Sequence, residues 1–162
     1  MIARRHLIFA GVLALFAAKA GAAFADATAK AFLDKIYAAY KGKNSKGIRL
    51  DTDAQLRLYF EPKLAAIMSK NQKDAARRGD VGDLDGDPFV NGQDWEIGKV
   101  DISVNDTAPD RATGTAKFDN LKMPTTVIYD LVKLKDGWRI ADITWPGNDA
   151  ANQTLRGIFV KK

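Results

Sequence analysis

The residues from Thr125 to Trp145 carry the strongest fold signal in the chain. Two runs rich in β-branched and aromatic residues flank Asp136-Gly137. An Asp-Gly pair between such runs predicts a β-hairpin with a two-residue turn. A turn at this pair would place Lys135 opposite Trp138. Two antiparallel strands are therefore expected near the C-terminal end of the chain.

The alternation of side chains along this hairpin predicts which residues share a face of the sheet. One face is expected to carry Tyr129, Leu131, Lys133, Trp138, Ile140, Asp142 and Thr144. The other face is expected to carry Ile128, Asp130, Val132, Leu134, Arg139, Ala141, Ile143 and Trp145. Because both faces are mostly apolar, we expect helices to cover one and further chain or a ligand to cover the other.

The first 25 residues have the composition of a secretory signal peptide. Arg4-Arg5 precedes an uncharged apolar run at residues 7–18, and Ala23-Phe-Ala25 gives an A-x-A cleavage pattern. The run is too short to span a membrane, and twin-arginine export is an alternative to the ordinary secretory route. We therefore expect a cleaved signal peptide at residues 1–25 and a single domain at residues 26–162. The mature protein would be bacterial, periplasmic or secreted, without a membrane anchor.

Charge and composition exclude several classes of function. Arg4, Arg5 and Lys19 leave with the signal, so 25 basic and 20 acidic residues become 22 and 20, and no basic stripe for nucleic acid remains. His6 is the only histidine, and the chain has no cysteine. The mature chain is therefore not expected to use Ser-His-Asp or Cys-His catalysis, or zinc or haem held by these ligands. We expect no cofactor.

Apolar spacing predicts helices in the first half of the mature chain. One helix is expected from Thr28 to about Lys41. The segment Thr52-Asp-Ala-Gln55 is a capping box for a second helical region. Pro62 suits the first turn of a further helix that ends at Gly79. Helices followed by strands indicate an α+β fold.

The loop from Asp80 to Trp95 is the segment that most resembles a metal site. Its alternating acids match the first half of a calcium loop, and another acid falls at the twelfth place. Pro88 stands where such a loop needs a glycine with positive φ, which proline cannot adopt. We therefore predict a turn-rich connection and no metal site. The weak calcium candidates are Asp83, Asp85, Asp87 and Asp94.

Three further features predict the rest of the fold. The strand pattern from Trp95 to Val104 keeps a period of two except at Gly98-Lys99, which indicates a β-bulge. Small residues alternate with polar ones at positions 112–118, so another element is expected to approach that face closely. A last amphipathic piece that begins near Leu155 is expected to dock as one or two helical turns.

Three segments together resemble a secreted bacterial family known as domain of unknown function 3828. They are Asp87-Pro-Phe89, Gln93-Asp-Trp95 and Asp136-Gly-Trp-Arg-Ile-Ala-Asp-Ile143. The resemblance covers nearly the whole mature chain. It implies a cystatin-like or nuclear-transport-factor-2-like α+β cone, in which a long N-terminal helix and further helices pack on a curved antiparallel sheet of about four strands. It implies no activity and supplies no catalytic residues.

Three functions are compatible with such a fold. The expected one is non-catalytic binding of a small molecule or peptide in or beside a curved-sheet pocket. An alternative is an inhibitor or immunity-type protein that binds another secreted protein, which Trp95 or Trp145 exposed in an apolar patch would support. Another is an isomerase or dehydratase that uses Asp142 as a base beside Tyr129. The residues predicted to bind a ligand are Tyr37, Tyr40, Tyr129, Asp130 and Asp142.

Overall fold

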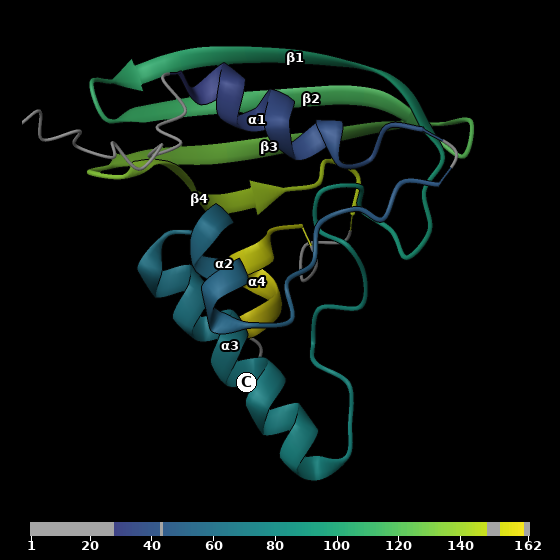
Figure 1. Cartoon of the computed structure of the whole chain (residues 1–162), viewed down its shortest axis with the longest axis vertical. Helices are drawn as coiled ribbons and strands as arrows, with labels where there is room; N and C mark the ends of the chain where they lie inside the picture. The colour runs from purple at the N-terminus through teal and green to yellow at the C-terminus, as the bar shows by residue number, and fades with distance from the viewer. Residues whose placement is uncertain (1–27, 43, 149–152, 161–162) are drawn as a thin grey trace, which may run out of the picture.

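Four antiparallel strands form one sheet, in the order β1-β2-β3-β4, in this computed structural model. The structure describes residues 28–42, 44–148 and 153–160, so the predicted signal peptide lies outside the described residues. The α+β fold predicted from the sequence is confirmed (Figure 1). Its elements are α1 (Ala29–Ala38), α2 (Asp53–Tyr59), α3 (Pro62–Arg78), β1 (Ile97–Ala108), β2 (Arg111–Asn120), β3 (Met123–Leu134), β4 (Gly137–Thr144) and α4 (Leu155–Val160).

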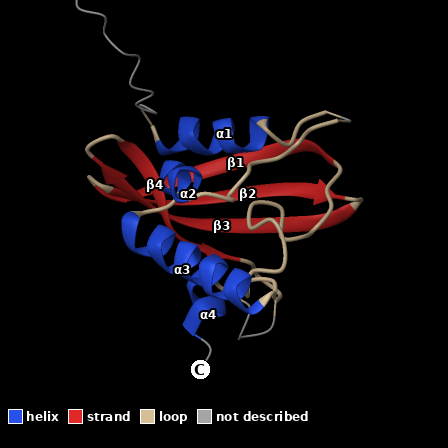
Figure 2. Ribbon diagram, turned by 60° about the horizontal axis from the view of Figure 1, so that its bottom comes forward, coloured by secondary structure: helices blue, strands red, loops and turns tan. Residues whose placement is uncertain are grey.

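The helices occupy two places relative to the sheet (Figures 1 and 2). α1 packs across β1 and β2. α2 and α4 pack against β4 at the other edge of the sheet, and α3 packs against both of them. Phe60 extends that edge through a bridge to Ile140, and the Glu61 N–H donates to the Ile140 carbonyl at 2.9 Å. β4 is therefore covered at its outer side, whereas β1 forms the opposite edge.

α1 begins as predicted but ends early. The Thr28 side chain accepts a hydrogen bond from the Ala31 N–H at 3.0 Å and caps the helix. After Ala38, the next two N–H groups bond to carbonyls three residues back, at 3.1 Å each. This tighter turn ends the helix, so the predicted end near Lys41 is wrong. The N-terminal helix has 10 residues, and α3, with 17, is the longer of the two.

The boundaries of α2 and α3 follow the local signals in the sequence. The predicted capping box is formed between Thr52 and Gln55 at the start of α2. Pro62 occupies the first turn of α3, where its missing N–H costs nothing. Gly79 ends α3 with a φ of 69°, in the left-handed region that favours glycine.

The C-terminal hairpin forms with a different turn from the one predicted. Gly137 already pairs within the β3–β4 ladder, so the turn residues are Lys135 and Asp136. Trp138 therefore faces Lys133, whose ammonium lies 5.9 Å from the centre of the indole ring. This contact favours the observed register. The shift is by two residues, so it leaves the alternation of faces unchanged near the turn.

A β-bulge in β4 reverses the faces further along the hairpin. After Ile140 the register slips by one residue, so Ala141 has no opposite residue and the next pair joins Asp130 to Asp142. A slip of one residue moves a side chain to the other face of the sheet. The prediction that Asp142 shares a face with Tyr129 is therefore wrong.

The β1 and β2 strands are longer than the sequence pattern indicated. The predicted bulge at Gly98-Lys99 is confirmed by a register shift between Ile97 and Val100. The β2–β3 turn consists of Leu121 and Lys122, which have φ values of 51° and 68° without being glycine. The turn expected at residues 119–124 is thus limited to two residues.

α1 closes the core over β1 and β2. A Cβ atom placed on Gly114 would lie 2.4 Å from Leu33 Cδ1, which confirms the close approach predicted for β2. On the opposite face, Asp101, Ser103 and Lys117 of β1 and β2 are exposed, whereas Val132 and Arg139 of the hairpin are buried, as expected for that segment. No helix of the described residues is long and apolar enough to cross a membrane.

Candidate functional site

The three tyrosines predicted to bind a ligand converge between α1 and the sheet. The Tyr37 O–H donates to the Phe89 carbonyl at 3.0 Å, and the Tyr129 hydroxyl lies 2.7 Å from that of Tyr37. Because Tyr37 has a single O–H, Tyr129 is the donor in this pair. Tyr37, Tyr40 and Tyr129 are at most 1% exposed, and burial raises the pKa of each hydroxyl. The rings and hydroxyls therefore belong to the core.

Tyr40 is joined to the acidic loop through Asp87. Its O–H donates to Asp87 Oδ2 at 2.6 Å, and its oxygen accepts from the Ile48 N–H at 3.2 Å. Asp87 Oδ1 accepts from the Phe89 N–H at 2.9 Å. Burial raises the pKa of Asp87, against the opposing effect of these two hydrogen bonds. The sequence singled out both residues but not the pair, because 47 positions separate them.

Asp130 and Asp142 lie on the face of the sheet opposite the tyrosines. Asp142 Oδ1 accepts from the N–H groups of Ile143 and Arg156, at 2.9 and 3.0 Å, and so ties β4 to α4. Partial burial raises the pKa of Asp142, and the facing Asp130 carboxylate contributes to this. The pair of Asp142 with Tyr129 that an isomerase would need does not form, because the bulge separates the two residues.

The acids of the loop from Asp80 to Trp95 bind separate donors of the protein. Asp83 accepts from the Asn71 amide at 2.6 Å, and Asp85 accepts from the Gln93 amide at 2.9 Å. Asp94 contributes its carbonyl, which accepts from the Asn120 amide at 3.2 Å. Within the part of the chain that the structure describes, no group of three or more carboxylates or histidines is placed to hold a metal ion.

A groove of about 490 Å³ lies beside Asp87. Two amides fix its walls to one another. Gln72 Nε2 on α3 donates to the Leu50 carbonyl at 3.0 Å, and Asn71 Oδ1 accepts from the Asp83 N–H at 2.9 Å. Because these bonds hold three segments together, the groove is preformed. Its apolar lining is supplied by Ile48, Leu50, Met68, Leu84, Trp95 and Phe159.

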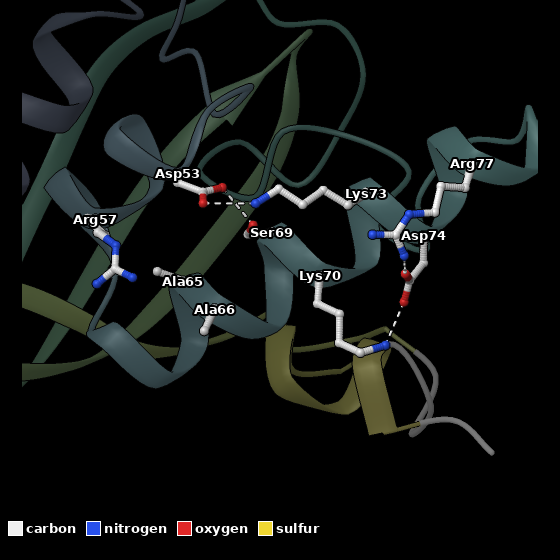
Figure 3. Close-up of a pocket in the computed structure, with 9 residues that line it drawn as sticks. All are labelled: Asp53, Arg57, Ala65, Ala66, Ser69, Lys70, Lys73, Asp74 and Arg77. Atoms are coloured by element: carbon white, nitrogen blue, oxygen red, sulfur yellow. Dashed lines mark hydrogen bonds and ion pairs between the residues drawn. The ribbon is translucent and has the colours of Figure 1, made fainter.

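A second concavity, of about 360 Å³, lies between α2 and α3 (Figure 3). Its charged groups bind one another. Asp53 accepts from Ser69 at 2.6 Å and from Lys73 at 2.9 Å, and Asp74 pairs with two further bases on α3. Exposed pairs of this kind add little stability and are screened by salt. This surface is therefore solvated and ion-paired, unlike the groove beside Asp87.

Comparison of the chain with protein-family models, with curated proteins and with solved structures finds no match. The resemblance to the secreted family and to the cystatin-like superfamily therefore stays a prediction.

The environment of Asp87 gives the first testable prediction. Because burial raises its pKa from the ordinary 3.8, the folded state binds this proton more tightly than the unfolded state. Its contribution to stability is therefore fully present below pH 3.8 and is lost as the pH rises through the raised pKa. Urea titrations of the wild type and of Asp87→Asn at several pH values measure this effect. The free energy of unfolding of the wild type minus that of the variant is expected to fall as the pH rises through the raised pKa.

A matched control for this titration is Asp53→Asn. Hydrogen bonds from Ser69 and Lys73 lower the pKa of Asp53, so its contribution is present at neutral pH and is lost as the pH falls. The corresponding difference should therefore change in the opposite direction. A difference for Asp87 that rises with pH would show that its hydrogen bonds outweigh the cost of burial.

Proposed function

We propose that this protein is a non-catalytic binding protein of the bacterial periplasm or exterior, and that the groove beside Asp87 holds a small molecule or a short peptide. The observation that carries the proposal is the groove of about 490 Å³, which combines apolar walls with the polar side chains of Asn71, Gln72 and Asp87. Ligand sites commonly have volumes of roughly 300–1,000 Å³ with apolar walls and a few fixed polar groups. The location outside the cytoplasm rests on the signal-peptide pattern of residues 1–25.

The ligand expected in this groove is apolar or amphipathic. The walls present Leu84, Met68 and Phe159. Of the three ionisable side chains in the lining, Asp87 accepts from Tyr40 at 2.6 Å, and Arg49 and Asp51 pair with each other at 2.5 Å. An ionic ligand would have to compete with that pair. An apolar ligand would gain the hydrophobic contribution directly.

We also propose that the fold is of the cystatin-like or nuclear-transport-factor-2-like kind. Four antiparallel strands with α1 across β1 and β2 support this relationship. In this chain Tyr37 and Tyr129 fill the space between helix and sheet. The proposed site is therefore beside the sheet rather than inside it.

The groove proposal is tested by thermal shift with a library of apolar small molecules and short peptides. A ligand at about 100 times its Kd stabilises a protein by about 2.7 kcal/mol, which raises the Tm measurably. Leu84→Glu places a charge in the groove and should abolish the shift. Leu58→Glu is the matched control, because Leu58 is 59% exposed and does not line the groove. An equal loss in both variants, or no stabilising compound at all, would contradict the proposal.

One observation supports catalysis as a second candidate function. Asp87 borders the groove, has a raised pKa and accepts a hydrogen bond from Tyr40 at 2.6 Å. A desolvated carboxylate beside a tyrosine is the arrangement considered above for an isomerase or dehydratase. Catalysis requires turnover of a groove ligand that Asp87→Asn removes while binding is retained. If the wild type turns over none of the compounds that bind, the catalytic function is contradicted and binding is the function that stands.

The inhibitor-type function stays a prediction. Of the two tryptophans expected in an apolar patch, Trp145 is 3% exposed, and its N–H donates to the Pro88 carbonyl at 3.0 Å. Trp95 is half-buried, and its N–H donates to Ser45 at 2.9 Å. Neither side chain therefore favours this function over binding in the groove.

A further inference from the structure

β1 is an edge strand with a regular, open outer side. It lies beside β2 alone in the sheet, and Figure 1 shows it as the outermost strand. Among the described residues, Lys41 bridges β1 only at Ile97. Register shifts lie at both ends of the strand, and between them Val100–Asp106 pairs with β2 without interruption. An uninterrupted open edge is a template for the addition of another strand.

The apolar side chains along this same stretch are only partly buried. Val100, Ile102 and Val104 lie on the α1 side of β1 and pack against the core, but each remains partly exposed. Their neighbours across the ladder, such as Ala116 in β2, are fully buried. Three β-branched side chains therefore present apolar surface at the border of the sheet. This edge lacks the inward-pointing charge that would protect it over these three positions.

We propose that two copies of this chain join their β1 strands antiparallel, about a two-fold axis centred on Ile102. The two four-stranded sheets would then form one continuous sheet of eight strands. In this register Val100 lies opposite Val104 of the partner subunit, and the two copies of Ile102 face each other. Cross-strand pairs of β-branched residues stabilise antiparallel sheets. The partly exposed side chains of Val100, Ile102 and Val104 would thus contact the same three side chains of the second copy.

The sequence of β1 selects this register over its neighbours. Opposite residues must point to the same face, so the axis must pass through a residue rather than between two. With the axis at Asp101, the Asp101 carboxylates of the two subunits would lie opposite each other. With the axis at Ser103, Val100 of one subunit would lie opposite Asp106 of the partner subunit. Like charges directly opposite are destabilising. The axis at Ile102 avoids both, because Asp101 then faces Ser103.

A second copy fits this edge because the apolar stripe of Val100, Ile102 and Val104 has the same order of residue types in both chain directions. The pattern Val100-x-Ile102-x-Val104 is symmetric about Ile102, as a two-fold interface requires. The lining of the groove beside Asp87 includes no residue of the Val100–Asp106 stretch. The dimer is therefore independent of the proposed binding function.

Sedimentation equilibrium over a wide range of protein concentration tests the dimer. The wild type is expected to show a reversible monomer–dimer equilibrium. Ser103 is exposed and would face Asp101 of the partner subunit at two symmetric places. Ser103→Asp creates two like-charge pairs and should raise the dimer Kd about tenfold. Ser103→Lys creates two opposite-charge pairs and should lower the Kd several-fold, with both effects reduced at high salt.

Thr126→Asp is the matched control. Thr126 lies on the same face of the sheet but in β3, and it pairs with Lys117 rather than with β1. It should leave the Kd unchanged, and circular dichroism should show that all three variants fold. A wild type that is monomeric at every concentration overturns the proposal. So does a dimer whose Kd shifts in the same direction with Asp and with Lys at position 103.

Discussion

Gly114→Ala is expected to lower the free energy of unfolding by about 1–3 kcal/mol, the usual cost of overpacking a well-packed core. The added Cβ would lie 2.4 Å from Leu33 Cδ1 and 3.4 Å from Leu131 Cδ1. Both leucines are fully buried. A distance of 2.4 Å is too short for two carbon atoms, so either α1 must move away from β2 or the Leu33 side chain must change its rotamer within the core. Urea unfolding measures the loss.

Two further variants show that this contact is the cause. Gly98→Ala is the matched control, because a Cβ there would meet no atom within 4 Å, and it should leave stability nearly unchanged. Leu33→Ala alone should cost about 2–5 kcal/mol through the cavity that it leaves. The double variant Gly114→Ala with Leu33→Ala should cost less than the sum of the single changes, since the shortened side chain makes room. Strictly additive losses would mean that the 2.4 Å approach does not limit the packing.

The features that the sequence predicted correctly are those decided by local chemistry. The Thr28 cap, the Thr52–Gln55 capping box and the end of α3 at Gly79 each depend on backbone groups within a few residues. The close approach at Gly114 was visible because Ala112, Gly114 and Ala116 alternate with polar residues along β2. Local pattern was sufficient in these places.

The features that the sequence did not predict depend on contacts between distant segments. No residue near Ala141 marks it as a bulge, yet the slip brings Asp142 to the Arg156 N–H at 3.0 Å. The left-handed Leu121-Lys122 turn also contains no glycine. There Asn120 accepts from the Glu96 N–H at 3.0 Å and fixes the register from outside the hairpin. At both the bulge and the turn, contacts between distant segments outweigh the local preferences of the residues.

The candidate site was predicted only in part, for the same reason. The sequence singled out Tyr37 and Tyr40, and the structure buries both: Tyr37 packs on Phe118 and Tyr129 of the sheet, and Tyr40 packs on Phe89 and Trp95. The sequence contained no information on the partners of their hydroxyls, which come from Phe89, Tyr129 and Asp87. The groove is built from five separate segments, so no local pattern identifies it.

Tyr37→Phe is expected to destabilise the protein more than Tyr129→Phe does, although each removes one hydroxyl. Tyr37 lies at the centre of the chain of hydrogen bonds, where it accepts from Tyr129 and donates to the Phe89 carbonyl. Its removal leaves two buried polar groups without these partners, at a cost of about 1–3 kcal/mol each. Tyr129→Phe removes one hydrogen bond and leaves the Tyr37 donor satisfied, at a cost of about 0.5–1.5 kcal/mol.

The double variant gives the decisive comparison for these tyrosines. Tyr37→Phe combined with Tyr129→Phe removes the unsatisfied Tyr129 hydroxyl as well, so it should be more stable than Tyr37→Phe alone. Tyr59→Phe is the matched control, because Tyr59 also packs on Phe89, at 5.9 Å between ring centres, but is only partly buried. It should change the free energy of unfolding little. If Tyr129→Phe proved the more costly single change, the Tyr37 O–H would donate to the Tyr129 hydroxyl rather than to the Phe89 carbonyl.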